Sequence, residues 1–253
     1  MNQYSPDDDL HLENYSRIVL SLQEARYDFC TFEEACIRGG SQPFVILRHD
    51  VDFSLRGAIQ VAELEKKVGV HSSFFIHLRS PLYNALSDYA SQVLRSIYEN
   101  GHDVGLHFDM CHYPDRSKIN DYLQKEIKLL TEFYPFANDK VVSFHRVGTS
   151  AHDLRDLILP NGVIHTYQRE FFQDITYFSD SGGRWRRGNP IFSDDFKFQR
   201  SMQIMTHPMW WTETGNNPYR KLESYLRGNR EQTIDFLEQT VISYSLSDIR
   251  LSI

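Results

Sequence analysis

Short apolar runs recur along the chain, and each is followed by a segment in which apolar residues return every three or four positions. The runs have the length of buried β-strands, whereas the segments between them have the period of amphipathic helices. Strands that alternate with helices in this way form parallel sheets covered by helices. The pattern therefore predicts an α/β protein, most simply an α/β barrel. The expected strands lie at residues 44–47, 71–76, 103–107, 141–145, 162–164, 175–179 and 202–206.

The two ends of the chain are predicted to be helical. Residues 1–42 are expected to pack on the outside of the core, and residues 230–246 are expected to close the chain as an amphipathic helix. Ser54 is the expected N-cap of the helix after the first strand, and Gly69 its end. No stretch has the composition of a linker, so residues 1–253 are expected to form a single domain. The apolar helix faces are Tyr15, Ile18, Val19 and Leu22 near the N-terminus, and Ile234, Leu237, Val241 and Ile242 near the C-terminus.

Composition narrows the class of protein. With 253 residues, of which 41% are hydrophobic, the chain can bury a full core without a disulfide. Its formal charge of −7 and its scattered arginines argue against nucleic acid as a partner. The three cysteines lack metal-ligand or redox spacing, and residues 1–9 lack the apolar core of a signal peptide, so a cytoplasmic location is expected. No stretch reaches the roughly 18 apolar residues of a membrane span.

Charged and imidazole side chains cluster where the apolar runs end. One cluster contains Asp50 and Asp52, a second contains His107 and His112, and a third contains His207. Since α/β enzymes keep their chemistry at the carboxyl ends of strands, these clusters are expected on one rim of the barrel. Together they make a metal-assisted hydrolase the leading hypothesis.

Asp52, His107 and His112 are the predicted metal ligands. Carboxylates and neutral imidazoles bind zinc and similar divalent ions, and three protein ligands leave a coordination position for water. Such a water becomes a nucleophile when a base, here Asp50, removes its proton. Judged by themselves, Asp50 and Asp52 are better interpreted as structural, with one carboxylate capping the next helix and the other bonded to a loop. The two histidines shift the interpretation toward a metal site. His102 precedes its strand and is expected to have a structural role.

His207 is the predicted general acid. It follows an apolar strand, and an imidazole at that rim protonates a leaving nitrogen when a carboxylate keeps the imidazole charged. Asp153, Asp180 and Asp194 are the candidate partners, and the sequence does not choose among them.

Further candidates lie on the loops. Arg146 follows the fourth expected strand. Trp185 follows a Gly-Gly step and offers a flat face of the kind on which sugars stack, although a flexible, solvent-exposed loop is an equally good interpretation. Trp210 either forms a wall of the pocket or is packed in the core.

Taken in order, these segments resemble the five motifs of the polysaccharide deacetylase superfamily, the NodB-homology or carbohydrate esterase 4 fold, over residues 44–211. The first motif corresponds to Asp50 and Asp52, which implies Asp50 as catalytic base and Asp52 as metal ligand. The second corresponds to a segment that ends in His107 and implies this residue as the first metal histidine. The resemblance implies a distorted (β/α) barrel with fewer than eight strands, and the removal of an N-acetyl group from a sugar.

The remaining motifs complete the site that the resemblance implies. Arg146 would orient the catalytic aspartate, as the arginine of the third motif does. Asp180 and Trp185 resemble the aspartate–tryptophan motif that contacts substrate. Ile204 would line an acetate pocket, and His207 would be the general acid.

The chain departs from the family pattern at the second metal histidine, whose usual position holds Cys111. Either His112 reaches the ion through a longer turn, or Asp109 substitutes for it, or the site binds metal poorly. Val147 and Gly148 replace the usual prolines of the third motif. With these changes the chain resembles a divergent branch, the deacetylase-like proteins of bacterial O-antigen and capsule clusters.

The hypothesis is therefore a metal-dependent hydrolase, with zinc as the expected ion. Its expected substrate is an acetamido sugar that is free, nucleotide-linked or lipid-linked. Two alternatives remain open, a non-catalytic carbohydrate-binding barrel that has lost the ion and a hydrolase of another non-peptide C–N bond.

Overall fold

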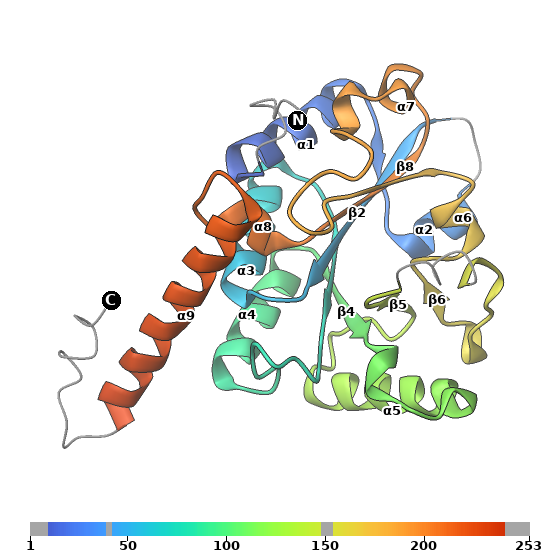
Figure 1. Cartoon of the computed structure of the whole chain (residues 1–253). Coiled ribbons are helices and arrows are strands. Elements are labelled where there is room, and N and C mark those ends of the chain that lie inside the picture. The colour runs from blue at the N-terminus through green and yellow to red at the C-terminus, as the bar shows by residue number, and fades with distance from the viewer. Residues whose placement is uncertain (1–9, 39–41, 148–153, 241–253) are drawn as a thin grey trace.

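A computed structural model describes residues 10–38, 42–147 and 154–240 of the chain. Seven parallel strands form one curled path in the order β6-β5-β4-β3-β2-β8-β7, and the two-residue β1 pairs with β2 off this path. The path forms a half-barrel surrounded by helices (Figure 1), so the predicted distorted (β/α) barrel with fewer than eight strands is confirmed. The strands are β1 Asp28–Phe29, β2 Phe44–Val51, β3 Ser73–Ile76, β4 Asp103–Phe108, β5 Val141–Phe144, β6 Ile164–His165, β7 Thr176–Ser179 and β8 Met202–Thr206.

Helices of regular length alternate with the strands from β2 to β5, after which α6 and α7 shorten to four residues each. The predicted boundaries of α3 are confirmed. Ser54 accepts a hydrogen bond from the Gly57 amide at 3.0 Å, and Gly69 ends the helix with a left-handed φ of 74°. The helices are α1 Leu12–Glu24, α2 Phe32–Ile37, α3 Leu55–Val68, α4 Asp88–Glu99, α5 Ile119–Phe133, α6 Arg169–Phe172, α7 Asp194–Lys197, α8 Pro208–Thr212 and α9 Pro218–Thr240.

The two terminal helices differ in how they pack. The predicted apolar face of α1 is buried against α3 and α8. The C-terminal helix α9 begins at Pro218, earlier than predicted, and extends away from the half-barrel (Figure 1). Ile234 on α9 is buried, but Leu237 is exposed. Val241 and Ile242 lie outside the described residues. No helix in the described part of the chain has the length and apolarity needed to cross a membrane.

Alternation along the strands decides which side chains enter the half-barrel, because residues two apart on a strand share a face. Arg48 and Asp50 on β2 point inward and contact Ser143 of β5 across the interior. Toward the amino ends of the strands, a small apolar cluster fills the interior of the half-barrel. Gly105 permits this packing, since a Cβ there would lie 2.8 Å from the Phe75 ring. The cluster consists of Phe32, Ile46, Phe75, Val141 and Phe171.

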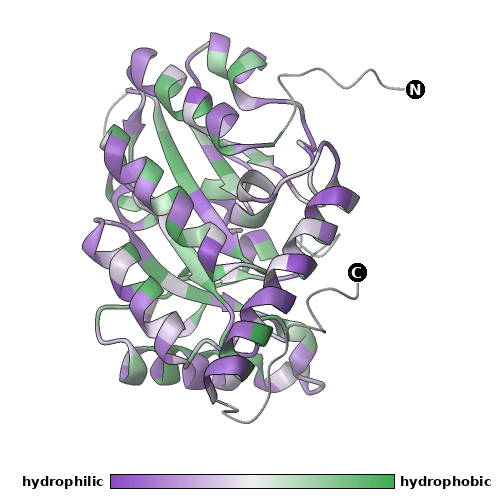
Figure 2. Cartoon of the chain, turned by 90° about the vertical axis from the view of Figure 1, so that its left-hand side faces the viewer, coloured by the Kyte–Doolittle hydropathy of each residue, from purple (hydrophilic) through white to green (hydrophobic). Residues whose placement is uncertain are grey.

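The outer face of the sheet packs against the helices and forms the main hydrophobic core. Figure 2 shows the hydrophobic strands behind helices whose outward faces are hydrophilic. A buried polar group interrupts this core. Glu65 of α3 lies 3.0 Å from His49 Nε2 and accepts a hydrogen bond from Ser72 at 2.6 Å. His102, at the amino end of β4, joins it through contacts of 3.1 Å with Ser72 and 3.0 Å with the carbonyl of Ala62.

Candidate active site

Four side chains that could hold a metal ion converge at the carboxyl ends of β2, β3, β4 and β5, namely Asp52, His77, His107 and His145. Their donor atoms all lie within 4.8 Å of one another. Asp52 Oδ1 is 3.1 Å from His107 Nε2. The same oxygen is 3.4 Å from His145 Nδ1 and 3.4 Å from His77 Nε2. Because donors about 2.0–2.1 Å from a tetrahedral ion lie roughly 3.3–3.4 Å apart, this spacing fits one divalent ion.

The state of these side chains also fits a metal. Asp52 Oδ1 is buried and accepts no well-oriented hydrogen bond from the described residues, although three imidazole nitrogens lie within 3.4 Å of it, an arrangement that a cation between them would satisfy. Burial by itself raises the pKa of Asp52, but the facing His207 and the imidazoles around it hold that pKa well below its ordinary value. Burial and the neighbouring His107 lower the pKa of His77. An ionised carboxylate and a neutral imidazole are the forms that bind divalent metals.

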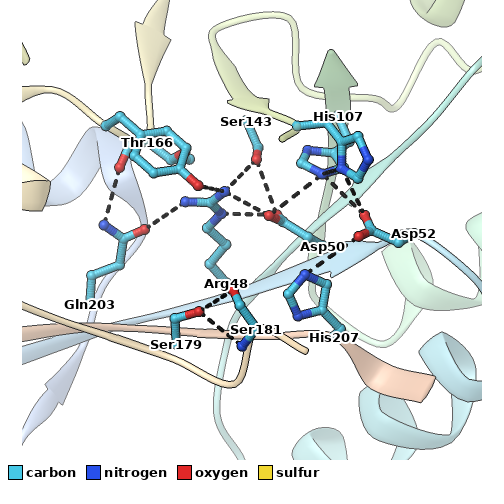
Figure 3. A network of polar contacts seen from close by, with 12 residues as sticks. Arg48, Asp50, Asp52, His107, Ser143, Thr166, Ser179, Ser181, Gln203 and His207 are labelled. Atoms are coloured by element: carbon cyan, nitrogen blue, oxygen red, sulfur yellow. Dashed lines mark hydrogen bonds and ion pairs between the residues drawn. The ribbon is translucent and has the colours of Figure 1, made fainter. Parts of the chain in front are cut away.

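Asp50 is held at the edge of this metal group by Arg48. Arg48 Nε donates to Asp50 Oδ1 at 2.9 Å, and Nη2 donates to Oδ2 at 2.6 Å, which makes a bidentate pair (Figure 3). Ser143 donates to Oδ1 at 3.1 Å. Burial by itself raises the pKa of Asp50, but Arg48 and then His107 lower it to about 2. In this arrangement Asp50 Oδ2 lies 3.6 Å from His107 Nε2.

Arg48 is itself fixed by its surroundings. Its Nη1 donates to Gln203 at 3.2 Å, and its Nη2 donates to Ser143 at 2.6 Å and to the Tyr167 hydroxyl at 3.2 Å. The guanidinium carbon lies 4.7 Å from the centre of the Tyr167 ring. Arg48 therefore presents Asp50 in one orientation.

His207 faces the metal group from β8, on the other side of Asp52. Its Nε2 lies 3.5 Å from Asp52 Oδ2, and its Nδ1 lies 2.6 Å from Asp180 Oδ1. Asp180 also accepts the His207 backbone amide at 2.9 Å and the Trp211 indole at 2.8 Å. Burial by itself lowers the pKa of His207, but Asp180 and then Asp52 raise it to about 9. The raised pKa favours the imidazolium form of His207, whose Nε2 faces the metal group.

These groups open into a cavity of about 370 Å³. Asp50, Asp52, His107 and His207 line its floor, and aromatic side chains form much of its wall. A second cavity of about 350 Å³ lies beside it and shares several of its lining residues. The aromatic wall consists of Phe53, Phe144, Tyr167 and Trp210.

The structure does not bring the predicted ligand His112 into the metal group. His112 lines the second cavity, with Nε2 3.6 Å from Asp109 Oδ2. Asp109 is ion-paired with Arg146 and accepts the Cys111 amide at 2.8 Å, so it does not replace His112 as a ligand. The side chain of Arg146 is 55% exposed and turned toward Asp109, whereas that of Arg48 is 0% exposed and pairs with Asp50. Arg48 thus makes the contact with Asp50 that was expected of Arg146, which lines the cavity without pairing with Asp50.

Of the four residues expected to contact substrate, Trp210 lines the cavity and the other three do not. Asp180 is entirely buried behind His207, which makes it the partner of the imidazole instead. Trp185 packs edge-on against Trp211, with ring centroids 5.6 Å apart. Ile204 lies on the outer face of β8, and its neighbour Met205 faces the cavity.

Asp180 resolves the choice of partner for His207 that the sequence left open. Asp194 begins α7 and makes no contact with His207, and Asp153 lies outside the described residues.

His77 and His145 are candidate ligands that the sequence patterns did not single out. His77 directly follows β3 and is two residues beyond the inward-facing Phe75. His145 likewise follows β5 and is two residues beyond Ser143. The period of two identifies both: His77 lies one residue past the strand predicted at 71–76, and His145 is the last residue of the strand predicted at 141–145.

Comparison with known proteins finds similar solved structures but no sequence match. No protein-family model matches the chain, and no curated protein sequence matches it. Among solved structures, it is similar to a family 4 carbohydrate esterase from Bacillus anthracis, with 13% identity, a TM-score of 0.43, and coverage of 85% of this chain and 86% of that one. A peptidoglycan deacetylase from Bdellovibrio bacteriovorus has 13% identity and a TM-score of 0.47, with coverage of 87% and 67%.

A family 4 pseudoenzyme from Bacillus anthracis is similar as well, with 15% identity, a TM-score of 0.39, and coverage of 77% of this chain and 64% of that one. The likeness concerns the fold, and the function of the chain is inferred from its own side chains.

Proposed function

We propose that this protein is a metal-dependent hydrolase that removes the N-acetyl group from an acetamido sugar. One observation carries the proposal: Asp50 and His207 approach the four-donor metal group from two sides, and both line one cavity together with Asp52, His107 and His145. Asp50 Oδ2 is 3.6 Å from His107 Nε2, and His207 Nε2 is 3.5 Å from Asp52 Oδ2. A base and an acid on opposite sides of a metal are what hydrolysis of an amide requires.

Asp52, His77, His107 and His145 would hold the ion. Zinc is the proposed metal, because imidazole nitrogens and a carboxylate oxygen are its usual ligands. When bound, a divalent ion polarises an amide carbonyl and makes a water molecule more acidic.

Asp50 is the proposed general base. Its Oδ1 accepts two hydrogen bonds, from Arg48 and Ser143, whereas Oδ2 accepts one, from Arg48, and faces the metal group; the proton of the attacking water is therefore accepted at Oδ2. Arg48 keeps this carboxylate oriented while the proton is transferred.

His207 is the proposed general acid. Its Nδ1 is held by Asp180, so the proton leaves from Nε2, which faces the metal group. The proton goes to the amine nitrogen as the C–N bond of the amide breaks, and acetate and the free amino sugar are released.

The aromatic wall supports a sugar as substrate. Trp210 and Phe53 lie beside each other, with ring centroids 5.8 Å apart, and both line the cavity. Such faces stack on the apolar face of a pyranose ring. The departures from the family pattern at Cys111 and Val147 support the divergent branch, so a nucleotide- or lipid-linked acetamido sugar in the cytoplasm is the proposed substrate form.

Acetate release from a panel of acetamido sugars, together with elemental analysis of the purified protein, tests the proposal. The wild-type protein should contain near-stoichiometric metal and release acetate from at least one sugar. Asp50→Asn should lose about 10²–10⁴-fold in rate while keeping its metal, because Asn cannot accept the proton. Asp115→Asn, a change at the surface away from the cavity, is the matched control. Equal rates for Asp50→Asn and the wild type would contradict the role of Asp50.

The metal group contains four protein donors rather than three, which favours a second candidate function: a non-catalytic barrel in which the metal is purely structural. Structural zinc sites use four protein ligands, whereas catalytic sites keep a position for solvent. The visible absorption spectrum of the Co²⁺-substituted protein separates the two candidates. A spectrum that changes when acetate is added supports the hydrolase, and one that is insensitive to acetate supports the structural site.

A further inference from the structure

We propose that the hydroxyl group of Tyr83 is a positioning group for the metal, and that it sets the spacing between Asp52 and His77. The inference rests on the metal-dependent function proposed above. Tyr83 lies in the loop between β3 and α4, and it does not line the catalytic cavity.

The geometry concerns the last hydrogen bond between β2 and β3. Val51 and Ile76 are the final register partners of these strands. In a parallel ladder of this register, the amide of the next residue, His77, donates to the carbonyl of Val51. Here the His77 amide donates to the Tyr83 hydroxyl at 2.8 Å, and that hydroxyl donates to the Val51 carbonyl at 2.7 Å. One phenolic oxygen is therefore inserted into the final rung.

The equivalent position on β4 and β5 has no such insertion. Phe108 and Phe144 are the last register partners there, and the His145 amide donates directly to the Phe108 carbonyl at 2.9 Å. The two strand ends that carry His107 and His145 are thus joined by an ordinary rung. The two that carry Asp52 and His77 are held apart by the hydroxyl group.

This insertion acts on the metal group because the hydroxyl joins His77, a proposed ligand, to Val51, the residue before the proposed ligand Asp52. Val51 precedes Asp52, and the amide that Tyr83 accepts belongs to His77 itself. Without the hydroxyl, the amide and carbonyl either close into a direct rung or lose their partners. Either change moves His77 relative to Asp52.

The test is a double-mutant cycle on zinc affinity, with Zn²⁺ alone titrated into the metal-free protein in competition with a chromophoric chelator. Tyr83→Phe keeps the ring and removes the hydroxyl. In the wild-type background it should weaken zinc binding about 10–100-fold, the usual cost of losing a group that orients a ligand. In the His77→Ala background the same change should alter the affinity by less than about threefold, because the ligand on which Tyr83 acts is gone.

Tyr27→Phe is the control for the loss of a tyrosine hydroxyl bonded to the backbone. The Tyr27 hydroxyl donates to the Arg200 carbonyl at 3.1 Å, away from the metal group. Tyr27→Phe should bind zinc as the wild type does, and the metal-free forms of both phenylalanine variants should melt within a few degrees of each other.

Wild-type zinc affinity in Tyr83→Phe, or an equal loss with and without His77, would overturn the inference. A melting temperature of Tyr83→Phe far below that of Tyr27→Phe would also overturn it, since the hydroxyl would then be a general structural tie. A wild-type protein that binds no zinc is a different outcome, because it overturns the proposed function and this inference with it.

Discussion

Arg48 and Asp50 lie two residues apart on the inner face of β2 and are joined by two hydrogen bonds of 2.9 and 2.6 Å. A carboxylate paired with an arginine on its own strand owes its orientation to the sheet rather than to a loop. Ser143 and Tyr167 hold the guanidinium from the opposite side of the half-barrel. The proposed base is therefore built into the rigid part of the fold, which is the arrangement that precise proton transfer requires.

Arg48→Lys should lower kcat about 10²-fold with little change in KM, because lysine cannot make the bidentate contact that aligns Asp50. Arg146→Lys is the matched control, since Arg146 pairs with Asp109 at the cavity edge. It should leave kcat within about threefold of the wild type, because it does not touch Asp50. Steady-state kinetics of the two variants, with circular dichroism to verify folding, makes the comparison. The reverse ranking would assign the orienting role to Arg146.

Asp180→Asn should move the alkaline limb of the profile of kcat/KM against pH to lower pH. Asp180 raises the pKa of His207, so without this carboxylate the imidazole loses its proton at a lower pH. The acid must be protonated to act, and activity therefore declines earlier as the pH rises. Asp195→Asn, at an exposed ion pair with Arg200, is the control and should keep the wild-type limb. If the alkaline limb of Asp180→Asn stays where it is in the wild type, deprotonation of His207 is not what causes that limb.

His77→Ala and His112→Ala should differ sharply in metal affinity. His77 Nε2 lies 3.4 Å from Asp52 Oδ1, whereas His112 Nε2 lies beside Asp109 in the second cavity. Loss of His77 should weaken zinc binding by more than the roughly 10–100-fold typical of groups that only orient a ligand. His112→Ala should leave it nearly unchanged. Chelator competition measures both, and a larger loss for His112→Ala would restore that histidine to the ligand set.

Glu65→Gln should destabilise the fold by about 1.5–3 kcal/mol at neutral pH, because it removes a fully buried carboxylate that accepts hydrogen bonds from Ser72 and Tyr15 and lies 3.0 Å from His49 Nε2. Burial by itself raises the pKa of Glu65, but His49 and the surrounding hydrogen bonds hold it below the ordinary value of 4.5. Since the pKa is lower in the folded state, this stabilisation is complete above pH 4.5 and is lost as the pH falls through the lowered pKa.

Urea denaturation from pH 3 to 7 tests this pH dependence. The difference in the free energy of unfolding between the wild type and Glu65→Gln should shrink as the pH decreases. Glu63→Gln, at an exposed position on the same helix, should show a small difference at every pH. A gap for Glu65→Gln that does not change with pH would contradict the assignment.

The architecture follows from local patterns in the sequence. Apolar runs gave the strands, and Ser54 and Gly69 gave the boundaries of α3, because a cap and a left-handed glycine act within a few residues. The strand predicted at residues 44–47 continues to Val51, since Arg48 and Asp50 neutralise each other inside the barrel. An ion pair between residues on one strand has no hydrophobic pattern to reveal it.

The composition of the site was harder to predict than its location. Asp52 and His107 lie in one group because strand ends of a parallel sheet share a rim, which the position of both residues at strand ends indicated. Which residues can be ligands depends on the face of the sheet toward which the residues just after each strand point. His77 lies one residue beyond the strand that the pattern indicated, so the pattern did not include it. Arg146 and His112 were chosen by motif spacing. Both line the cavities around Asp52, but Arg146 is ion-paired with Asp109 and His112 lies beside Asp109, so neither joins the four-donor metal group.

The central claim is that Asp52, His77, His107 and His145 bind one divalent ion. Anomalous diffraction at the zinc absorption edge, from crystals of the protein loaded with Zn²⁺, tests it most directly. The account predicts a single strong peak about 2.0–2.2 Å from Asp52 and from the ligating imidazole nitrogens. The absence of a peak there, or a peak coordinated by His112 and Asp109 in the second cavity, would contradict it.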